Sequence, residues 1–127
     1  MNTYIPLAGR ILLAAIFLVA GAGKVFGFAG TQQYMAAYGI PFTAPLALAA
    51  LLTEIVGGLL LLAGFKAKYA AGVLCAFLIP TTLIFHTNFA DQIQSIMFLK
   101  NLAIMGGLLY VVAYGAGDLS LDKRLSS

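Results

Sequence analysis

Four long apolar stretches dominate the pattern of hydrophobic and polar positions along the chain. They cover about residues 5–28, 42–65, 67–85 and 95–115. A helix crosses a bilayer with roughly 20 mostly apolar residues. The stretches lack the alternation of period two that marks barrel strands, and in lipid the backbone amides need partners inside their own helix. The pattern predicts an all-α, polytopic membrane protein built as a bundle of four transmembrane helices.

The segments between these stretches are polar. Residues 30–39 are too polar to span and are bounded by glycines, so we expect a short helix lying on the surface. Residues 87–92 form a polar link, and the Gly115-Ala116-Gly117 breaker ends the fourth stretch. The length indicates a single domain over residues 1–127.

The first stretch is expected to remain in the membrane as a helix. Ala20-Gly21-Ala22 has the small residues of a signal-peptide cleavage site, but no Lys or Arg precedes the stretch and Arg10 lies inside it. The stretch is also long for the apolar region of a signal peptide.

Composition excludes several classes of protein. The chain is 62% hydrophobic and 9% charged, whereas an ordinary soluble domain has about 25% charged residues. A soluble enzyme, a disordered chain and a nucleic-acid binder are therefore excluded, and the bilayer is the expected surrounding. Lys66, Lys68, Lys123 and Arg124 fall on one side of a four-helix topology, while the other links have no Lys or Arg. The positive-inside rule then predicts cytoplasmic termini.

Five polar residues inside or near the ends of the apolar stretches are candidates for a ligand-binding or intramembrane polar site. They are Arg10, Lys24, Glu54, Lys100 and Asn101. An ionisable residue near the bilayer centre costs at least about 2.5–3.5 kcal/mol, so it normally faces a partner or a cavity.

Glu54 lies near the centre of the second stretch, on the same helix face as Gly57 and Gly58. Glycines let another helix approach closely, so we expect Glu54 to point into the bundle. It is either a proton-responsive or ligand-binding carboxylate, or a structural group that holds the helices in register. Lys100 or Lys24 is the favoured cationic partner, and Arg10 is a further possibility.

Arg10 and Lys24 recur on one stripe of the first helix, about 21 Å apart. Lys24 either snorkels to the interface or faces a partner. Lys100 can snorkel outward, and Asn101 is expected to hydrogen-bond across helices.

A pocket in the outer half of the bundle is suggested by Glu54, Asn101, Lys100, Lys24 and His86, whereas Arg10 stands alone in the other half. Glu54 would form its floor, and the link over residues 32–38 would form its roof, with Tyr34 and Tyr38 as covering aromatics. His86 closes the third stretch, where a lone histidine is more typical of an interface than of a catalyst. Pro80 is expected to kink the third helix as a packing feature.

No metal site or intrachain thiol chemistry is expected. Cys75 is the one cysteine and His86 the one histidine, so a disulfide, a CxxC pair and a metal-ligand cluster are absent from the sequence. A thiol in an apolar span is also a poor nucleophile.

The chain resembles the DoxX family of small bacterial four-helix membrane proteins, from about residue 5 to residue 124. The matching pieces are Gly9-Arg10 with Ala14-Ala15-Ile16-Phe17, Gly21-Ala22-Gly23-Lys24 with Phe28, Tyr34 with Gly39-Ile40-Pro41, Glu54 with Gly57-Gly58 and Gly64, Phe98-Leu99-Lys100-Asn101-Leu102-Ala103, and the tail Leu119-Ser120-Leu121-Asp122. The resemblance implies the bacterial inner (plasma) membrane and a link to quinone-dependent or thiol-related oxidoreductases. It carries no catalytic residue set to this chain.

Three interpretations follow. In the first, the chain is an accessory subunit of a membrane oxidoreductase that binds a quinone-like or other amphipathic molecule without a covalent bond, with electrons supplied by a membrane or soluble redox partner. In the second, it is a structural or assembly protein. In the third, it is a small transporter, which would call for a homo-oligomer because four short helices enclose little room.

Overall fold

The computed structural model describes residues 4–126. Its four long helices are α1 (Tyr4–Phe26), α3 (Thr43–Ala63), α4 (Ala67–Phe85) and α5 (Gln92–Tyr114). Each is long and apolar enough to cross a membrane. The described residues contain no strand. The prediction of an all-α membrane protein with four spanning helices is therefore confirmed.

The boundaries differ from the predicted ones by a few residues, for local reasons. Helix α5 begins three residues earlier than expected because the Asp91 side chain accepts a hydrogen bond from the Ile93 amide at 2.9 Å and so caps the helix N-terminus. The link after α1 contains the expected short helix, α2 (Phe28–Ala37). The tail folds into one further short helix, α6 (Leu121–Ser126), which the sequence pattern did not predict.

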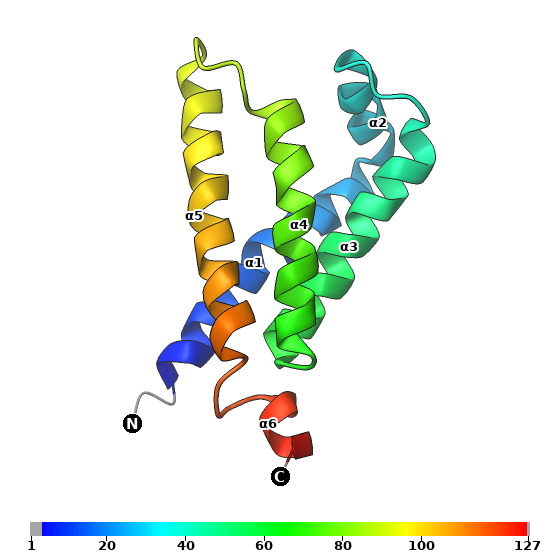
Figure 1. Ribbon diagram of the computed structural model, residues 1–127. Coiled ribbons are helices and arrows are strands. Elements are labelled where there is room, and N and C mark those ends of the chain that lie inside the picture. The colour runs from blue at the N-terminus through cyan, green and yellow to red at the C-terminus, as the bar shows by residue number, and fades with distance from the viewer. Residues whose placement is uncertain (1–3, 127) are drawn as a thin grey trace.

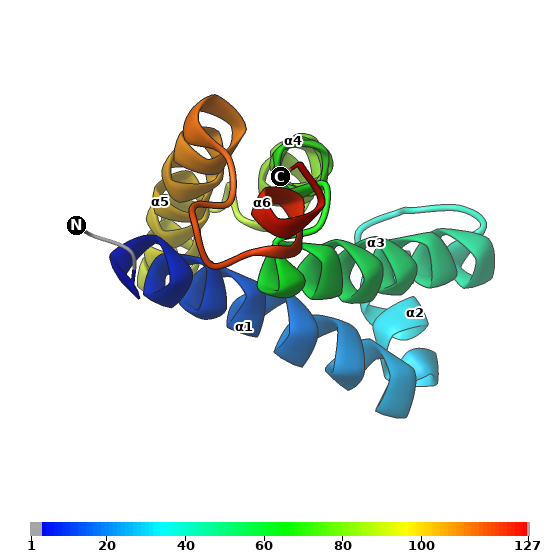
Figure 2. The same ribbon diagram turned by 90° about the horizontal axis from the view of Figure 1, so that it is seen from below.

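The helices form an open bundle with two distinct ends (Figure 1). Helix α3 packs against α1 and α4, and α5 packs mainly against α4. The start of α1 and helix α6 lie at one end, called here the terminal end, and α2 lies at the other, called the α2 end (Figure 1). Seen from the terminal end, α1 runs away from α5 toward α2 (Figure 2).

Small residues bring the helices close at the centre of the bundle. A Cβ on Gly21 of α1 would lie 2.6 Å from Ile55 Cγ1, and a Cβ on Gly57 would lie 2.9 Å from a methyl group of Leu74 in α4. Side chains larger than hydrogen would push these helices apart. The close approach places Glu54, which precedes Ile55 on α3, inside the bundle, where it is buried.

Hydrogen bonds of two charged side chains stabilise the terminal end. Asp122 accepts from the amides of Lys66 and Ala67 at the start of α4. The Arg10 side chain is buried, and its Nη1 donates to the carbonyl oxygens of Leu61 at 3.1 Å and Leu62 at 3.0 Å. Its Nη2 donates to the carbonyl oxygen of Leu119. A cation at these carbonyls suits the negative end of the α3 dipole. Arg10 therefore caps α3 and lies apart from Glu54, so it is not the partner of that carboxylate.

Candidate ligand-binding site

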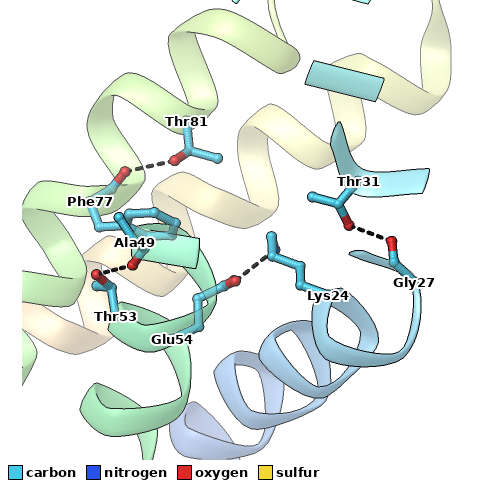
Figure 3. A network of polar contacts seen from close by, with 8 residues as sticks. All are labelled: Lys24, Gly27, Thr31, Ala49, Thr53, Glu54, Phe77 and Thr81. Atoms are coloured by element: carbon cyan, nitrogen blue, oxygen red, sulfur yellow. Dashed lines mark hydrogen bonds and ion pairs between the residues drawn. The ribbon is translucent and has the colours of Figure 1, made fainter. Parts of the chain in front are cut away.

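Lys24 and Glu54 form an ion pair between α1 and α3. Lys24 Nζ lies 2.6 Å from Glu54 Oε1, and the two side chains point toward each other (Figure 3). Gly21, one turn before Lys24, makes this possible, since a Cβ there would already lie 3.3 Å from Glu54 Cβ. Lys24 is one of the two partners that the sequence favoured. Away from water such a pair attracts strongly, so it joins α1 to α3.

A cavity of about 680 Å³ lies beside this pair, toward the α2 end. The cavity is partly open, and its lining comes from the last turns of α1, helix α2, the first half of α3 and the second half of α4. Its lining is mostly apolar: Ala20, Gly23, Lys24, Gly27, Gly30, Thr31, Tyr34, Met35, Ile40, Leu46, Ala50, Phe77, Pro80, Thr81, Ile84, Phe85 and His86. The pocket hypothesis placed Glu54 at the floor of the cavity, but Glu54 does not line it. Glu54 instead pairs with Lys24, which is a lining residue.

Aromatic side chains build the roof. The rings of Tyr34 and Tyr38 in and after α2 have centroids 5.2 Å and 4.9 Å from that of Phe85 in α4. Their hydroxyl oxygens are 3.3 Å apart, and this hydrogen bond, with burial, raises the pKa of Tyr34 to about 12. Tyr34 itself lines the cavity. These contacts attach α2 to the end of α4 beside the cavity.

His86, Thr31 and Thr81 supply the remaining polar groups of the lining. His86 follows α4, and its Nδ1 is buried without a hydrogen-bond partner among the described residues. Burial lowers the pKa of His86, so the ring is neutral at neutral pH. The two threonine hydroxyls are occupied by backbone carbonyls one turn earlier, Thr31 at 3.1 Å from Gly27 O and Thr81 at 2.8 Å from Phe77 O (Figure 3). The threonine donors are therefore used within the chain, and Lys24 and His86 are the lining side chains that can donate to a ligand.

Lys100 and Asn101 were expected beside the same pocket as Lys24, but they do not line the cavity, and Arg10 stands apart in the other half, as its sequence position predicted. Arg10 caps α3 at the terminal end. Asn101 donates through Nδ2 to Thr82 Oγ1 at 3.0 Å, which is the hydrogen bond across helices that its sequence position predicted. Lys100 is exposed and lines a different groove. The periodicity of a single helix defines its faces, but it does not define which neighbour each face meets.

The sequence did not indicate most of the cavity wall. Phe77, Ile84 and Leu46 line the cavity, yet apolar residues of a spanning helix look alike whether they face lipid, a helix or a ligand. Thr31 and Thr81 are also lining residues. They stand out from their surroundings only as hydroxyls in helices, a signal too common to mark a site.

Comparison with known proteins agrees with this architecture. The DoxX family model matches residues 5–87. The chain is 45% identical over 121 residues to Inner membrane protein YqjF of Escherichia coli, covering 94% of this chain and 91% of that protein. It is 34% identical to Inner membrane protein YphA of the same organism, covering 93% of this chain and 88% of that protein.

More distant similarity extends to eukaryotes. The Surfeit locus protein 4 homolog of Schizosaccharomyces pombe is 29% identical over 130 residues, covering 97% of this chain and 38% of that longer protein. No solved structure matches the chain significantly. The family match covers more than half of the chain, and two bacterial relatives are covered over most of their length. Together with the four-helix membrane fold, these matches show that the chain belongs to the DoxX family.

Proposed function

We propose that this chain is a bacterial inner-membrane protein that binds a neutral amphipathic small molecule of the quinone type and acts as an accessory subunit of a membrane oxidoreductase. The observation that carries the proposal is the apolar cavity with Lys24 in its wall. The inner-membrane location is supported by the names of the two bacterial relatives.

The cavity has the size and lining of a small-molecule site. Its volume of about 680 Å³ lies within the roughly 300–1,000 Å³ typical of ligand pockets, which are mostly apolar with a few polar groups that orient the ligand. A molecule with a ring and an apolar tail can reach such a cavity from the surrounding lipid. The apolar walls would hold the tail, and Lys24 and His86 would address the polar ring.

The charge balance favours a neutral head group. The Glu54 carboxylate offsets the charge of Lys24 at 2.6 Å, and His86 is neutral at neutral pH because burial lowers its pKa. The site therefore has hydrogen-bonding groups without net charge. Quinone carbonyls accept hydrogen bonds from the amine N–H of a lysine or the ring N–H of a histidine. A ring NH and a lysine can also pass protons to a reduced quinone.

Electron transfer would rely on another protein. Cys75 is the only cysteine of the chain, so one copy has no thiol pair to exchange electrons with a quinone. The partner would supply the electrons, and this chain would hold and orient the acceptor.

The test uses the purified chain in lipid nanodiscs with a short-chain ubiquinone. Gly23→Leu introduces a side chain at a lining position where a Cβ meets no atom within 4 Å, so the helix can accept it and the cavity is filled. Gly106→Leu is the matched control, because its Cβ also has open space and it does not line the cavity. We expect native mass spectrometry to show one quinone per wild-type and Gly106→Leu chain, and none with Gly23→Leu.

Two results would contradict the proposal. Equal quinone occupancy in Gly23→Leu and wild type would place the quinone elsewhere. A wild-type chain that is well folded yet retains only phospholipid would favour the structural or assembly role instead.

A further inference from the structure

A second hollow lies on the side of the bundle away from the ligand cavity. It is a groove of about 750 Å³ between α1 and α5, and it shares no lining residue with the cavity. The two helices touch where Leu13 meets Gly107, since a Cβ on that glycine would lie 3.1 Å from Leu13 Cδ2. Figure 2 shows α1 diverging from α5. Leu108 and Val111 are the buried residues of α5, whereas Tyr110 and Tyr114 of the groove wall are exposed.

Lys100 lies in the wall of this groove and is exposed. It is eight residues from the start of α5 at Gln92, which is about 12 Å along the helix axis. No carboxylate of the described residues lies within ion-pair distance of it. A lysine at such a depth is costly unless it finds a partner or reaches the interface.

The chain itself has no carboxylate to offer, even from a second copy. It has four acidic residues. Glu54 is paired with Lys24, Asp91 caps α5, Asp122 accepts hydrogen bonds from the amides that begin α4, and Asp118 follows α5 at the terminal end. The last three lie outside the spanning helices, so none reaches the depth of Lys100 in a parallel dimer.

A lipid phosphate is the competing partner for Lys100, because a lysine side chain near a helix end can turn toward the interface. The shape of the groove favours a helix instead. Its wall has small residues with open space or exposure, Gly9 and Ala103, which allow a helix backbone to approach closely. A carboxylate on that helix would match the charge of Lys100.

We propose that the α1–α5 groove docks a transmembrane helix of a different protein, and that an Asp or Glu of that helix pairs with Lys100 within the membrane. The docking surface is separate from the ligand cavity, so this proposal stands or falls independently of quinone binding.

The test is site-specific photocrosslinking in living cells of the native host. A photoreactive phenylalanine replaces Leu12, an exposed residue of the groove wall. The control replaces Val73, which is exposed on α4 and lines neither hollow. We expect a Leu12 adduct with a membrane protein whose crosslinked peptide includes a spanning segment with Asp or Glu, and no such adduct from Val73.

Dependence on Lys100 decides the result. Lys100→Met should weaken the adduct by about tenfold or more, since it leaves the partner carboxylate unpaired, whereas Lys100→Arg should retain it. Lys100→Glu combined with Lys at the mapped partner position should restore it. The melting temperature of purified Lys100→Met should equal that of wild type, because Lys100 makes no ion pair within the chain. Adducts with lipid alone, adducts with a second copy of this chain, or an adduct of equal strength in Lys100→Met would overturn the proposal.

Discussion

The Lys24–Glu54 pair is asymmetric, and the asymmetry has consequences for mutation. The Glu54 side chain is 7% exposed, whereas that of Lys24 is 27% exposed. Lysine also has a long stem that can turn toward the interface if its partner is lost. Glu54 has no such freedom in the middle of α3. Removal of the lysine should therefore cost more than removal of the carboxylate.

We predict that Lys24→Met destabilises the protein by about 3–5 kcal/mol, the range for a buried charge left unpaired. Glu54→Gln should cost less, and the double variant should be more stable than Lys24→Met alone. Thermal unfolding of the purified variants in one detergent measures all three. If Glu54→Gln folds normally but loses quinone binding, the pair serves the ligand. If the double variant is no more stable than Lys24→Met, the pair does not carry the coupling assigned to it.

The Tyr34–Tyr38 hydrogen bond should give the roof a response to alkaline pH. The pKa of Tyr34 is raised from 10.0 to about 12, so the folded state holds this proton more tightly than the unfolded chain. The resulting stability is fully present below pH 10 and is lost as pH rises toward 12.

We expect the melting temperature of wild type to fall more steeply between pH 10 and pH 12 than that of Tyr34→Phe. Tyr69→Phe, an exposed position on α4, serves as the control and should follow wild type. Identical slopes for all three proteins would show that the roof does not depend on this proton.

At the scale of the elements, the junction between α3 and α4 depends on groups from distant parts of the chain. Helix α3 is capped at its C-terminus by Gly64, whose φ of 71° is left-handed. Helix α4 begins at Ala67, whose amide donates to the Asp122 carboxylate at 2.9 Å. The Asp122 amide in turn donates to Gly64 O at 2.9 Å. Orphan helix-end groups are thus satisfied by the tail. Loss of structure in α6 should therefore also destabilise this junction, because the hydrogen bonds of Asp122 connect the two.

We predict that Gly64→Ala destabilises the protein by about 1–2 kcal/mol from the left-handed backbone alone, with a further loss because the added methyl would meet Arg10 and Ser120. Gly9→Ala is the control. Gly9 lies inside α1 with open space around its Cα, so that change should be neutral or stabilising by up to about 1 kcal/mol. Chemical or thermal unfolding distinguishes the two, and equal effects would contradict the assigned role of Gly64.

At the scale of the whole molecule, basic residues gather at one end. Lys66, Lys68 and Lys123 line one shallow hollow at the terminal end, together with Asp118 and Asp122. The α2 end has no Lys or Arg in its links. The positive-inside rule therefore predicts that the terminal end faces the cytoplasm. The ligand cavity would then lie in the outer half of the membrane.

We predict that a fluorescent protein fused after Ser127 fluoresces, and that alkaline phosphatase fused there is inactive, because the positive-inside rule predicts a cytoplasmic tail. The reverse pattern should hold for fusions after Gly39, in the link on the other side. An active phosphatase at the C-terminus would reverse the orientation and move the cavity to the cytoplasmic half.

The sequence by itself determined the membrane class, the four spans and the surface helix after α1. These depend on local free energy: apolar side chains leave water, and each helix satisfies its own amides within one segment. It also identified Glu54 as a residue that needs a partner and Lys24 as one of two favoured partners, since the cost of a charge in lipid depends on its depth along one helix.

Only the tertiary structure decided which of these residues meet. Arg10 caps α3, Asn101 donates to Thr82, and Lys100 lines a separate groove, and the sequence did not indicate these different neighbours. The crossing of α1 and the divergence of α5 separate them. Helix packing in lipid depends on the fit of small residues such as Gly21 and Gly57 between two surfaces, and that fit is a property of both helices together.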